Sequence, residues 1–491
     1  MKKLTILSLA SVLAAASFVG CNSDYIPAEN TSSSVVVYSF KLSKDDSVLA
    51  HLDTVFFSID LDKSRIYNAD SLPYGTSTEK LVPVIKMLET VSRATLTVTR
   101  KDGTDTTYNY LTNSTDTIDF SNGPVKLEIT SPSGTVSRTY SVEVNVHRLK
   151  GDSLTWSNTA RRVLPSSLTA PVAQRTVRTA DAVYCLTTDG SAYAVATAET
   201  PATESWDTYT AALPAGADIN TFSATDDALF ILAGGTLHTS ADGARTWTST
   251  GLTWNTIYGA YGKRLIGAAK DASGKWFMQE YPASQGAATE LPADMPVSGT
   301  SVPIPFSFPL SGSSQIVITG GTLASGALTA HTWAFDGTSW ARISEQPVGT
   351  ALKDMTVVPY FTFYTNSAFV ATEYSVLLAY GGNDGKKNNS TVYISNDYGL
   401  TWSKGSDLIQ LPKYVPAMTA AQAYVFESTL TDSRASSMWT SFEIASSRAI
   451  YPVTSWDCPY IYTFGGIGDD GKLLPTVWRS TLNRFTFKPV Q

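Results

Sequence analysis

The 491-residue chain has few charged residues and few cysteines. Asp, Glu, Lys and Arg together make up 16% of it, the formal net charge is −7, and Lys and Arg are not grouped in blocks. A mildly acidic chain without basic blocks lacks the electrostatic footprint that nucleic-acid binding needs. We therefore expect no nucleic-acid partner.

Long amphipathic helical patterns are also rare in this sequence. Short apolar runs separated by Gly, Pro, Ser and Thr dominate instead, and this is the pattern of β-strands joined by turns. The four histidines are isolated, and no spacing of Cys, His or carboxylate residues resembles a metal site. The sequence therefore predicts an all-β protein, for which we expect no metal and no other cofactor.

One long apolar run lies near the N-terminus, in residues 4–19. It leads into Phe-Val-Gly-Cys at residues 18–21, which resembles a bacterial lipobox except that Phe18 stands where Leu is usual. We expect a lipoprotein signal peptide in residues 1–20, lipidation at Cys21 and a flexible tether in residues 21–34. The alternatives are an ordinary cleaved signal and a membrane-anchor helix, although the run is short for a membrane span.

Lipid chains on Cys21 would hold the protein at a membrane while its domains stay in water. The expected location is thus the cell envelope, with the anchor in the outer membrane on its periplasmic or surface face. Cys185 and Cys458 are then the remaining cysteines. A disulfide between them stays open, but their offsets in the surrounding strands differ, so we favour two separate, partly buried thiols.

Residues 35–148 alternate between apolar and polar side chains, as strands of a two-sheet domain do. In the clearest strand, Tyr140, Val142, Val144 and Val146 would share one face. Several such short strands in one stretch predict an Ig-like β-sandwich. The turn-rich residues 66–76 form either a ligand-facing loop or a loop packed on the sandwich.

Residues 152–491 contain a degenerate repeat. Residues 395–402, Ser-Asn-Asp-Tyr-Gly-Leu-Thr-Trp, match the Asp-box pattern Ser-x-Asp-x-Gly-x-Thr-Trp at every defined position. We expect inner strands at residues 182–186, 229–233, 264–268, 315–319, 376–380 and 460–464. Gly pairs follow four of them, at Gly234-Gly235, Gly320-Gly321, Gly381-Gly382 and Gly465-Gly466. The repeat predicts a Kelch/Asp-box-like β-propeller of six blades, with a seventh left open by the long spacing between the last two pairs.

The carboxylates at the motif positions are best explained as turn formers. Asp397 can accept hydrogen bonds from backbone N–H groups of its own turn, and Gly399 supplies a conformation that residues with a Cβ resist. Asp242 and Asp336 lie in similar turns. We therefore expect no catalytic residue here and a structural Asp-box, made of Ser395, Asp397, Gly399, Thr401 and Trp402.

The outer strands of the repeat carry a tryptophan, as at Trp206, Trp247, Trp340 and Trp402. Trp156 has the same setting, with Leu-Pro downstream, but no strand with a Gly pair precedes it. A ring of sheets gains most when its two ends are joined, because open strand edges are a liability. We therefore predict that residues 153–157 pair in one sheet with residues 477–480.

The most unusual stretch of the repeat is an apparent insertion at residues 431–460. Loops of more than about 12–15 residues are usually functional or disordered. Its polar and aromatic side chains would suit a sugar or a peptide, although it could equally just cover an open edge. The candidate binding residues are Arg434, Trp439, Arg448, Trp456, Asp457 and Tyr460.

The lipobox, the sandwich, the loop at residues 68–76, the propeller and the C-terminal residues 477–484 occur together. This combination resembles a family of Bacteroidota envelope lipoproteins built from domains of unknown function. The resemblance covers nearly the whole mature chain and implies an envelope location and a two-domain layout. It implies no activity, so no catalytic residue is transferred from it.

Three functions remain open on the sequence. We favour a non-enzymatic, membrane-anchored lipoprotein whose propeller binds a glycan or a protein. The alternatives are a glycoside hydrolase or lyase acting at the axial face of the propeller, and a scaffold subunit of an outer-membrane complex. Asp-box sialidases need an Arg-Ile-Pro motif and an arginine triad, and Kelch copper oxidases need a Cys–Tyr pair with two His. Neither set is evident here.

Overall fold

The computed structural model describes residues 33–148, 150–283, 289–307, 314–365, 371–431 and 455–483. They form two compact units, one before and one after residue 149. Cys21 and the expected signal peptide lie outside the described residues. Within the described ranges, no helix is both long enough and apolar enough to cross a membrane.

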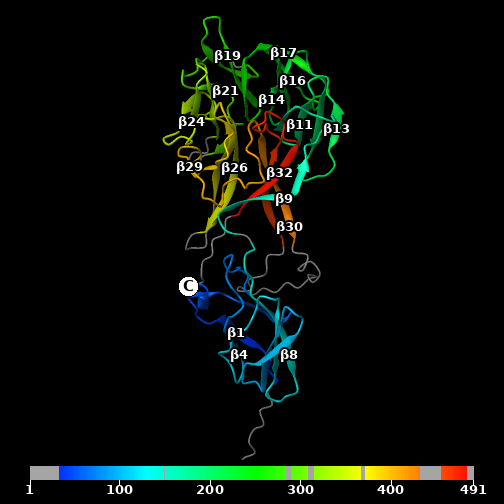
Figure 1. Cartoon of the computed structure of the whole chain (residues 1–491), viewed down its shortest axis with the longest axis vertical. Helices are drawn as coiled ribbons and strands as arrows, with labels where there is room; N and C mark the ends of the chain where they lie inside the picture. The colour runs from blue at the N-terminus through cyan, green and yellow to red at the C-terminus, as the bar shows by residue number, and fades with distance from the viewer. Residues whose placement is uncertain are drawn as a thin grey trace, which may run out of the picture. The chain divides into compact units, whose positions relative to one another are not determined.

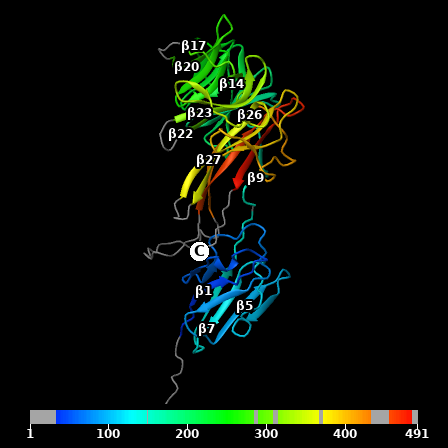
Figure 2. The ribbon, with the colours of Figure 1, turned by 90° about the vertical axis from the view of Figure 1, so that its left-hand side faces the viewer.

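The first unit consists of two sheets around one apolar core (Figure 2). The smaller sheet pairs β1 (Val37–Leu42) with β4 (Pro83–Met87). A short 3-10 turn, η2 (Leu52–Thr54), follows β1. The larger sheet has the order β2 (Ser58–Asp60), β3 (Arg65–Tyr67), β8 (Ser137–Glu143), β7 (Val125–Thr130), β5 (Arg93–Thr99), β6 (Asp105–Asn109). All pairings are antiparallel except β3–β8, and the unit is a β-sandwich as predicted.

Tyr140 connects the two sheets of the sandwich. It lies on β8 and is completely buried, as is Val142 on the same face. Its hydroxyl donates a hydrogen bond of 2.9 Å to Val35 O and accepts one of 3.2 Å from Val37 N. Because a buried tyrosine hydroxyl needs a partner, these bonds fix the first strand against the larger sheet.

The loop at residues 68–76 packs on the sandwich through an asparagine clamp. The Asn68 side chain donates 2.9 Å hydrogen bonds to Asp70 O and Asn145 O, and its Oδ1 accepts a bond from Asn145 N. Leu72 is buried, whereas Tyr74 is half exposed. Two alternatives were predicted for this loop, and packing on the sandwich is the one that Asn68 and Leu72 follow.

The second unit consists of six sheets, which we call blades 1 to 6 in chain order (Figure 1). Blade 1 is β10 (Ala173–Arg178), β11 (Val183–Thr188), β12 (Tyr193–Ala198) and β13 (Asp207–Thr210). Blade 2 is β14 (Ala217–Ala224), β15 (Leu229–Ala233), β16 (Thr236–Ser240) and β17 (Thr248–Thr253). Blade 3 is β18 (Thr256–Tyr261), β19 (Arg264–Lys270) and β20 (Trp276–Tyr281).

Blade 4 is β21 (Pro296–Ser298), β22 (Ile304–Ser307), β23 (Ser314–Leu323), β24 (Leu328–Phe335) and β25 (Trp340–Arg342). Blade 5 is β26 (Lys353–Thr365), β27 (Ala371–Asn383), β28 (Tyr393–Ser395) and β29 (Ser403–Lys404). Blade 6 is β30 (Gln422–Thr431), β31 (Ser455–Phe464), β32 (Thr476–Asn483) and the early strand β9 (Ser153–Val163). The described residues thus form six blades and leave no seventh between Gly382 and Gly466.

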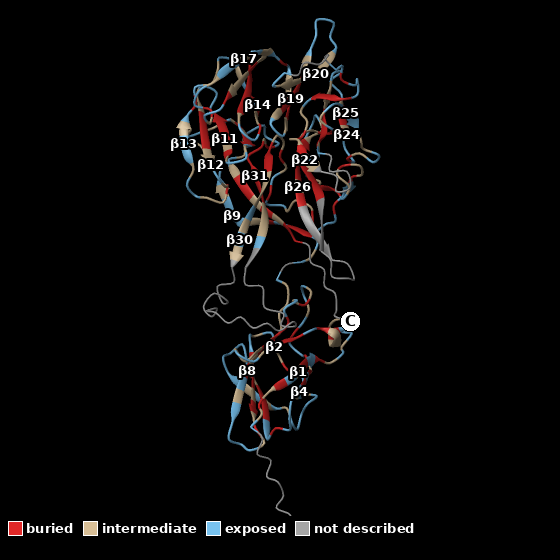
Figure 3. Cartoon of the chain, turned by 180° about the vertical axis from the view of Figure 1, so that it is seen from behind, coloured by how far each residue is buried: buried red, intermediate tan, exposed pale blue. Residues whose placement is uncertain are grey.

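The first strands of neighbouring blades contact one another around the ring and so line its axis. These contacts join β10 to β14, β14 to β18, β26 to β30, and β30 back to β10. The apolar strands were expected to be innermost, but the structure shows that they are the second strand of each sheet. These strands are β11, β15, β19, β23, β27 and β31. Each is covered by a sheet neighbour on both sides, and this explains their high apolar content (Figure 3).

The Gly pairs lie where these second strands meet the next blade. A Cβ on Gly320 would lie only 2.5 Å from Leu352 O, at the start of blade 5, and one on Gly381 would collide with the Met418 carbonyl before blade 6. Both glycines have positive φ angles. Gly320 and Gly381 are therefore needed for close contact between blades, whereas a Cβ on Gly234 would meet no atom within 4 Å.

The ring closes as predicted, through β9. Ser480 on β32 pairs with Trp156, and Asn483 pairs with Ser153, more than 300 positions away in sequence. The Trp156 ring is buried edge-on against Tyr380, at 5.5 Å, and against Trp478, at 6.3 Å. The N-terminal end of the propeller thus supplies the fourth strand of its last blade (Figure 1).

The two cysteines of the propeller are separate thiols, as favoured from the sequence. Cys185 lies on β11 of blade 1 and Cys458 on β31 of the adjacent blade 6. Cys185 is buried more deeply than expected, because no part of it is exposed. This burial raises the pKa of its thiol to about 12, so it stays protonated and unreactive near neutral pH.

Candidate functional site

The Asp-box lies in the hairpin between β28 and β29 and uses its side chains locally. Asp397 Oδ1 accepts hydrogen bonds from Thr401 N (2.9 Å) and Ser395 Oγ (2.8 Å). Its Oδ2 accepts a bond of 2.6 Å from Thr401 Oγ1. The buried Trp402 then donates from Nε1 to Thr332 Oγ1 of blade 4, at 2.9 Å. The box therefore shapes a turn and joins two blades.

The degenerate box at residues 240–247 has the same hydrogen bonds. Asp242 Oδ1 accepts bonds from Thr246 N (2.9 Å) and Ser240 Oγ (2.8 Å), and Oδ2 accepts one from Thr246 Oγ1 (2.6 Å). These bonds lower the pKa of Asp242 to about 2. Asp336 likewise accepts bonds from the backbone N–H groups of Thr338 and Ser339. Their carboxylates are already used in the turns, so these motif acids are poor candidates for proton transfer.

The expected binding loop at residues 431–460 is shorter than predicted. β30 continues to Thr431, and β31 begins at Ser455, paired with it. Trp456, Asp457 and Tyr460 are therefore strand residues rather than loop residues. Backbone pairing between β30 and β31 extends the hairpin beyond the apolar residues from which the strands were predicted. The remaining candidates lie outside the described residues: Arg434, Trp439 and Arg448.

The described candidates from that stretch have structural contacts. Asp457 is exposed and accepts a hydrogen bond of 2.7 Å from Thr429 Oγ1 on the paired strand. Tyr460 is half-buried, and the Arg479 guanidinium lies 4.4 Å from its ring centroid. Asp457 thus joins β31 to β30, and Tyr460 joins β31 to β32.

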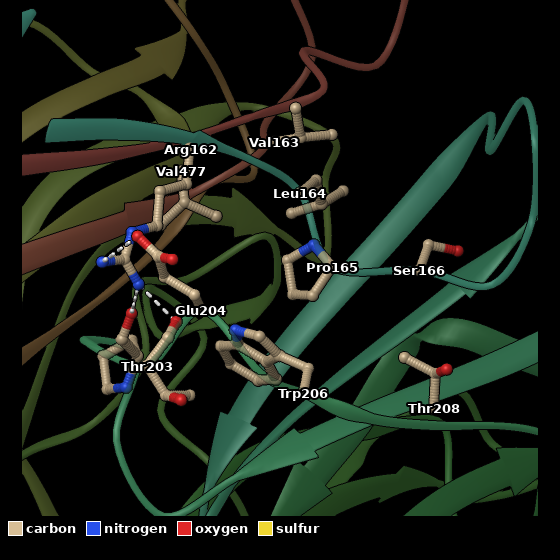
Figure 4. Close-up of a pocket in the computed structure, with 11 residues that line it drawn as sticks. Arg162, Val163, Leu164, Pro165, Ser166, Thr203, Glu204, Trp206, Thr208 and Val477 are labelled. Atoms are coloured by element: carbon tan, nitrogen blue, oxygen red, sulfur yellow. Dashed lines mark hydrogen bonds and ion pairs between the residues drawn. The ribbon is translucent and has the colours of Figure 1, made fainter. Parts of the chain in front are cut away.

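A pocket of about 470 Å³ lies where blade 6 meets blade 1 (Figure 4). We call it the seam pocket. It is formed by the end of β9, the segment after it, the start of β32 and the connection between β12 and β13. Its lining residues are Arg162, Val163, Leu164, Pro165, Ser166, Pro201, Thr203, Glu204, Trp206, Thr208 and Val477. Sequence reasoning missed it because its walls come from three distant segments.

Arg162 holds one wall of the seam pocket in place. Its Nη1 donates to the carbonyl oxygens of Ala202, at 2.6 Å, and Thr203. Its Nη2 lies 3.9 Å from a carboxylate oxygen of Glu204, whose side chain is 93% exposed. An exposed pair at this distance contributes little stability. The Glu204 carboxylate is therefore free to meet a ligand, whereas Arg162 is mainly occupied by the loop.

Trp206 provides the aromatic surface of the seam pocket. It precedes the fourth strand of blade 1, as the repeat pattern predicts for an outer-strand tryptophan. Its ring packs edge-on against Phe464 at 6.2 Å and remains partly exposed. Thr208 and Ser166 add hydroxyl groups near it (Figure 4). An indole face beside hydroxyl and carboxylate groups suits a ligand with both apolar and hydroxyl-bearing faces.

Four arginines of the propeller do not converge into the triad of a sialidase in the part of the chain that is described. Arg245 lies over the Tyr209 ring and near Asp207, and Arg264 pairs with Glu280 at 2.8 Å. Arg161 lies over Trp478, and Arg162 binds the loop of blade 1. The described side chains also contain no group of three or more His, Cys, Asp and Glu residues that could hold a metal ion.

Comparison with protein families decides what kind of chain this is. The profile described as the DUF6242 beta propeller domain matches residues 150–490. The chain belongs to the DUF6242 family. The profile described as the DUF6242 N-terminal domain matches residues 28–144, so the two family domains correspond to the two units. A search of curated proteins finds no match.

Proposed function

We propose that this DUF6242 protein is a non-enzymatic envelope lipoprotein whose propeller binds a glycan at the seam pocket. The observation that carries the proposal is the partly exposed Trp206 ring inside a pocket of about 470 Å³. That volume lies within the range of small-molecule sites, which is roughly 300–1,000 Å³. Sugar rings stack on aromatic faces through their C–H groups and bond to polar groups through their hydroxyls.

The rim of the pocket supports a sugar rather than an apolar ligand. Glu204, Thr208 and Ser166 offer acceptors and hydroxyls, and Arg162 limits the net charge of this wall. The turn-bound carboxylates of Asp242, Asp336 and Asp397 support binding rather than hydrolysis. A lipid on Cys21, expected from the lipobox, would place this pocket at the envelope.

The proposal is tested with a glycan array probed by the soluble chain that lacks residues 1–21. We expect selective binding of one class of glycan, weakened by Glu204→Gln and by Thr208→Ala. Both side chains are exposed, so these variants should fold normally. Glu345→Gln, at an exposed position outside the pocket, is the matched control. Release of sugar products would favour the hydrolase or lyase, and an array without any bound glycan would favour the scaffold.

A further inference from the structure

Blade 6 turns one face of its sheet towards blade 1, and aromatic side chains cover this face. Tyr462 and Phe464 are buried there against Val183 of blade 1. Phe426 and Tyr460 belong to the same cluster but are partly exposed. They lie directly opposite one another on β30 and β31, and Phe426 packs edge-on against Tyr462 at 6.2 Å. Two neighbouring rings thus remain accessible at the outer end of the cluster.

Each of these two rings carries an arginine. Arg178 Cζ lies 4.4 Å from the centroid of Phe426, and Arg479 Cζ lies 4.4 Å from that of Tyr460. Residues directly opposite in an antiparallel pair have Cβ atoms about 4.5–5.5 Å apart. The two guanidiniums therefore lie over adjacent rings of one face. Arg178 comes from blade 1 and donates from Nη1 to Val425 O of blade 6 at 3.3 Å.

Neither arginine has a counter-ion in the part of the chain that the structure describes. By contrast, Arg264 of blade 3 lies over the Tyr261 ring and also pairs with Glu280 at 2.8 Å. The Nε of Arg479 is buried without a hydrogen-bond partner. Placing a charge in this setting has a desolvation cost that the fold does not compensate with a carboxylate. The two guanidiniums are therefore available to an anion from outside the chain.

The acids nearest in sequence do not offset this charge. Glu427 and Asp457 occupy the alternate positions of β30 and β31, which place their side chains on the opposite face of the sheet. Asp181 lies in the exposed turn after β10 and forms no ion pair with Arg178. The strands β9, β10 and β32 contain no acidic residue. Their other charged residues are Arg161, Arg162 and Arg175.

We propose that Arg178 and Arg479 form an acidic-sugar subsite, in which their guanidiniums bind the carboxylate of a uronic acid residue. A guanidinium presents a planar fork of N–H donors that matches a carboxylate, and the bonds are charge-assisted. The rings of Phe426 and Tyr460 hold the two forks in place by cation–π contact. The sugar class rests on the glycan-binding function proposed above, whereas the preference for an anion rests on the two arginines alone.

The acidic-sugar subsite lies close to the seam pocket along the same strand. Val477 lines the pocket and lies opposite Phe464, whereas Arg479 is two positions further along β32 and lies opposite Tyr462. Two residues of a strand span about 7 Å and point to the same face. A glycan bound at the seam pocket can thus present a neighbouring residue to the arginines. A free phosphate group offers a similar charge without the sugar, so the experiment includes it.

The test uses saturation-transfer NMR on the soluble chain lacking residues 1–21, with glucuronate, galacturonate and glucose as probes and inorganic phosphate as competitor. We expect a signal from at least one uronate. Arg178→Gln and Arg479→Gln should each weaken uronate binding about tenfold or more, because a charge-assisted bond is lost, and should leave any glucose signal unchanged. Arg479→Lys keeps the charge without the planar fork and should have intermediate affinity.

The control is Arg245→Gln, which removes an arginine that lies 4.0 Å from the Tyr209 ring centroid but already pairs with Asp207. It should leave uronate binding unchanged. Because Arg178 is exposed, its variant should also keep the wild-type melting temperature.

Three results would overturn the acidic-sugar subsite. Phosphate that displaces the uronate as effectively as free uronate does would show a general anion site. Unchanged uronate affinity in both Gln variants, with weakening by Glu204→Gln, would overturn the subsite and leave the seam pocket. A wild-type chain that binds a neutral arrayed glycan but no uronate would do the same. A chain that binds neither would overturn the proposed function as well.

Discussion

At the scale of single residues, two turns with different sequences reach the same geometry. Tyr398 and Gly399 have φ angles of 58° and 95°, and Gly243 and Ala244 have angles of 73° and 67°. Each box thus places two successive residues in the left-handed region, and the glycine occupies the second place in one box and the first in the other. The hydrogen bonds of the aspartate are the constant element, and the glycine position is the variable one.

Because Asp397 serves its own hairpin, its removal should cost stability and not ligand binding. We expect Asp397→Ala to lower the free energy of unfolding by about one to a few kcal/mol, because three donors lose their acceptor. Urea denaturation of the soluble chain measures this change. Loss of glycan binding at an unchanged unfolding midpoint would instead assign Asp397 to the ligand.

Gly399 should be less replaceable than a glycine with a similar φ angle elsewhere. A Cβ on Gly399 would lie 2.7 Å from Thr332 Cγ2, the residue that accepts the Trp402 hydrogen bond. Gly385 has a φ of 92° and no atom within 4 Å of such a Cβ. Gly399→Ala should therefore lower the melting temperature more than Gly385→Ala does. Equal losses would show that only the backbone angle matters.

Asp354 should make the stability of the protein depend on pH in an unusual direction. Burial raises its folded pKa above the unfolded value, so ionisation destabilises the fold at all pH values above the folded pKa. The cost disappears as the pH falls towards about 4. We expect Asp354→Asn, which tolerates a positive φ, to raise the melting temperature at neutral pH and to lose this gain near pH 4.

The matched control for this pH dependence is Asp271, whose pKa is shifted in the opposite direction. Hydrogen bonds from Ser273 and Lys275 lower the pKa of Asp271 in its exposed hairpin turn. Its stabilising effect is present above the unfolded pKa and is lost as the pH falls through the lowered value. Asp271→Asn should thus reduce stability at neutral pH. A loss of stability in Asp354→Asn at neutral pH would contradict the raised pKa.

At the scale of strands, the sequence pattern identified the apolar strand of each blade but assigned it to the wrong position. It was expected to be innermost, whereas it is the second strand of its sheet. The second strand of a blade is covered on both sides within its sheet, and its run of apolar residues is therefore the most visible, as in β15. The first strands contact one another around the axis and carry polar residues such as Arg175 on β10. Their weak apolar pattern hid them, and with them the residues of the axis.

The closing strand β9 allows the strongest test at this scale. A chain that begins at residue 150 retains all of β9, whereas one that begins at residue 158 lacks the residues that pair with Arg479 to Asn483. The shorter chain should lose stability, because β32 becomes an open edge and Trp156 no longer covers Trp478. Thermal unfolding of both chains measures the difference. Equal melting temperatures would show that β9 is not needed to close the ring.

At the scale of the whole molecule, the ring could be predicted, but its pockets could not. Ring closure could be predicted because Trp156 has the sequence context of an outer strand, although no strand with a Gly pair precedes it. The seam pocket takes its walls from residues 162–166, 201–208 and 477, and no single motif spans them. Only the closure of the ring through β9 brings these segments together. Trp206 and the Leu164-Pro165 pair were the available signals.

The last prediction concerns where the whole molecule resides. The residues before the sandwich contain a positively charged start, an apolar run and Val19-Gly20-Cys21, in which a small residue precedes the cysteine. A thioether-linked lipid at Cys21 would partition into the membrane, since each buried methylene contributes about 0.8 kcal/mol. We expect the wild-type protein in the membrane fraction and Cys21→Ala in the soluble fraction. Cys458→Ala, which leaves the lipobox intact, is the control. Membrane retention of Cys21→Ala at the wild-type level would refute lipid anchoring and leave an uncleaved helix as the explanation.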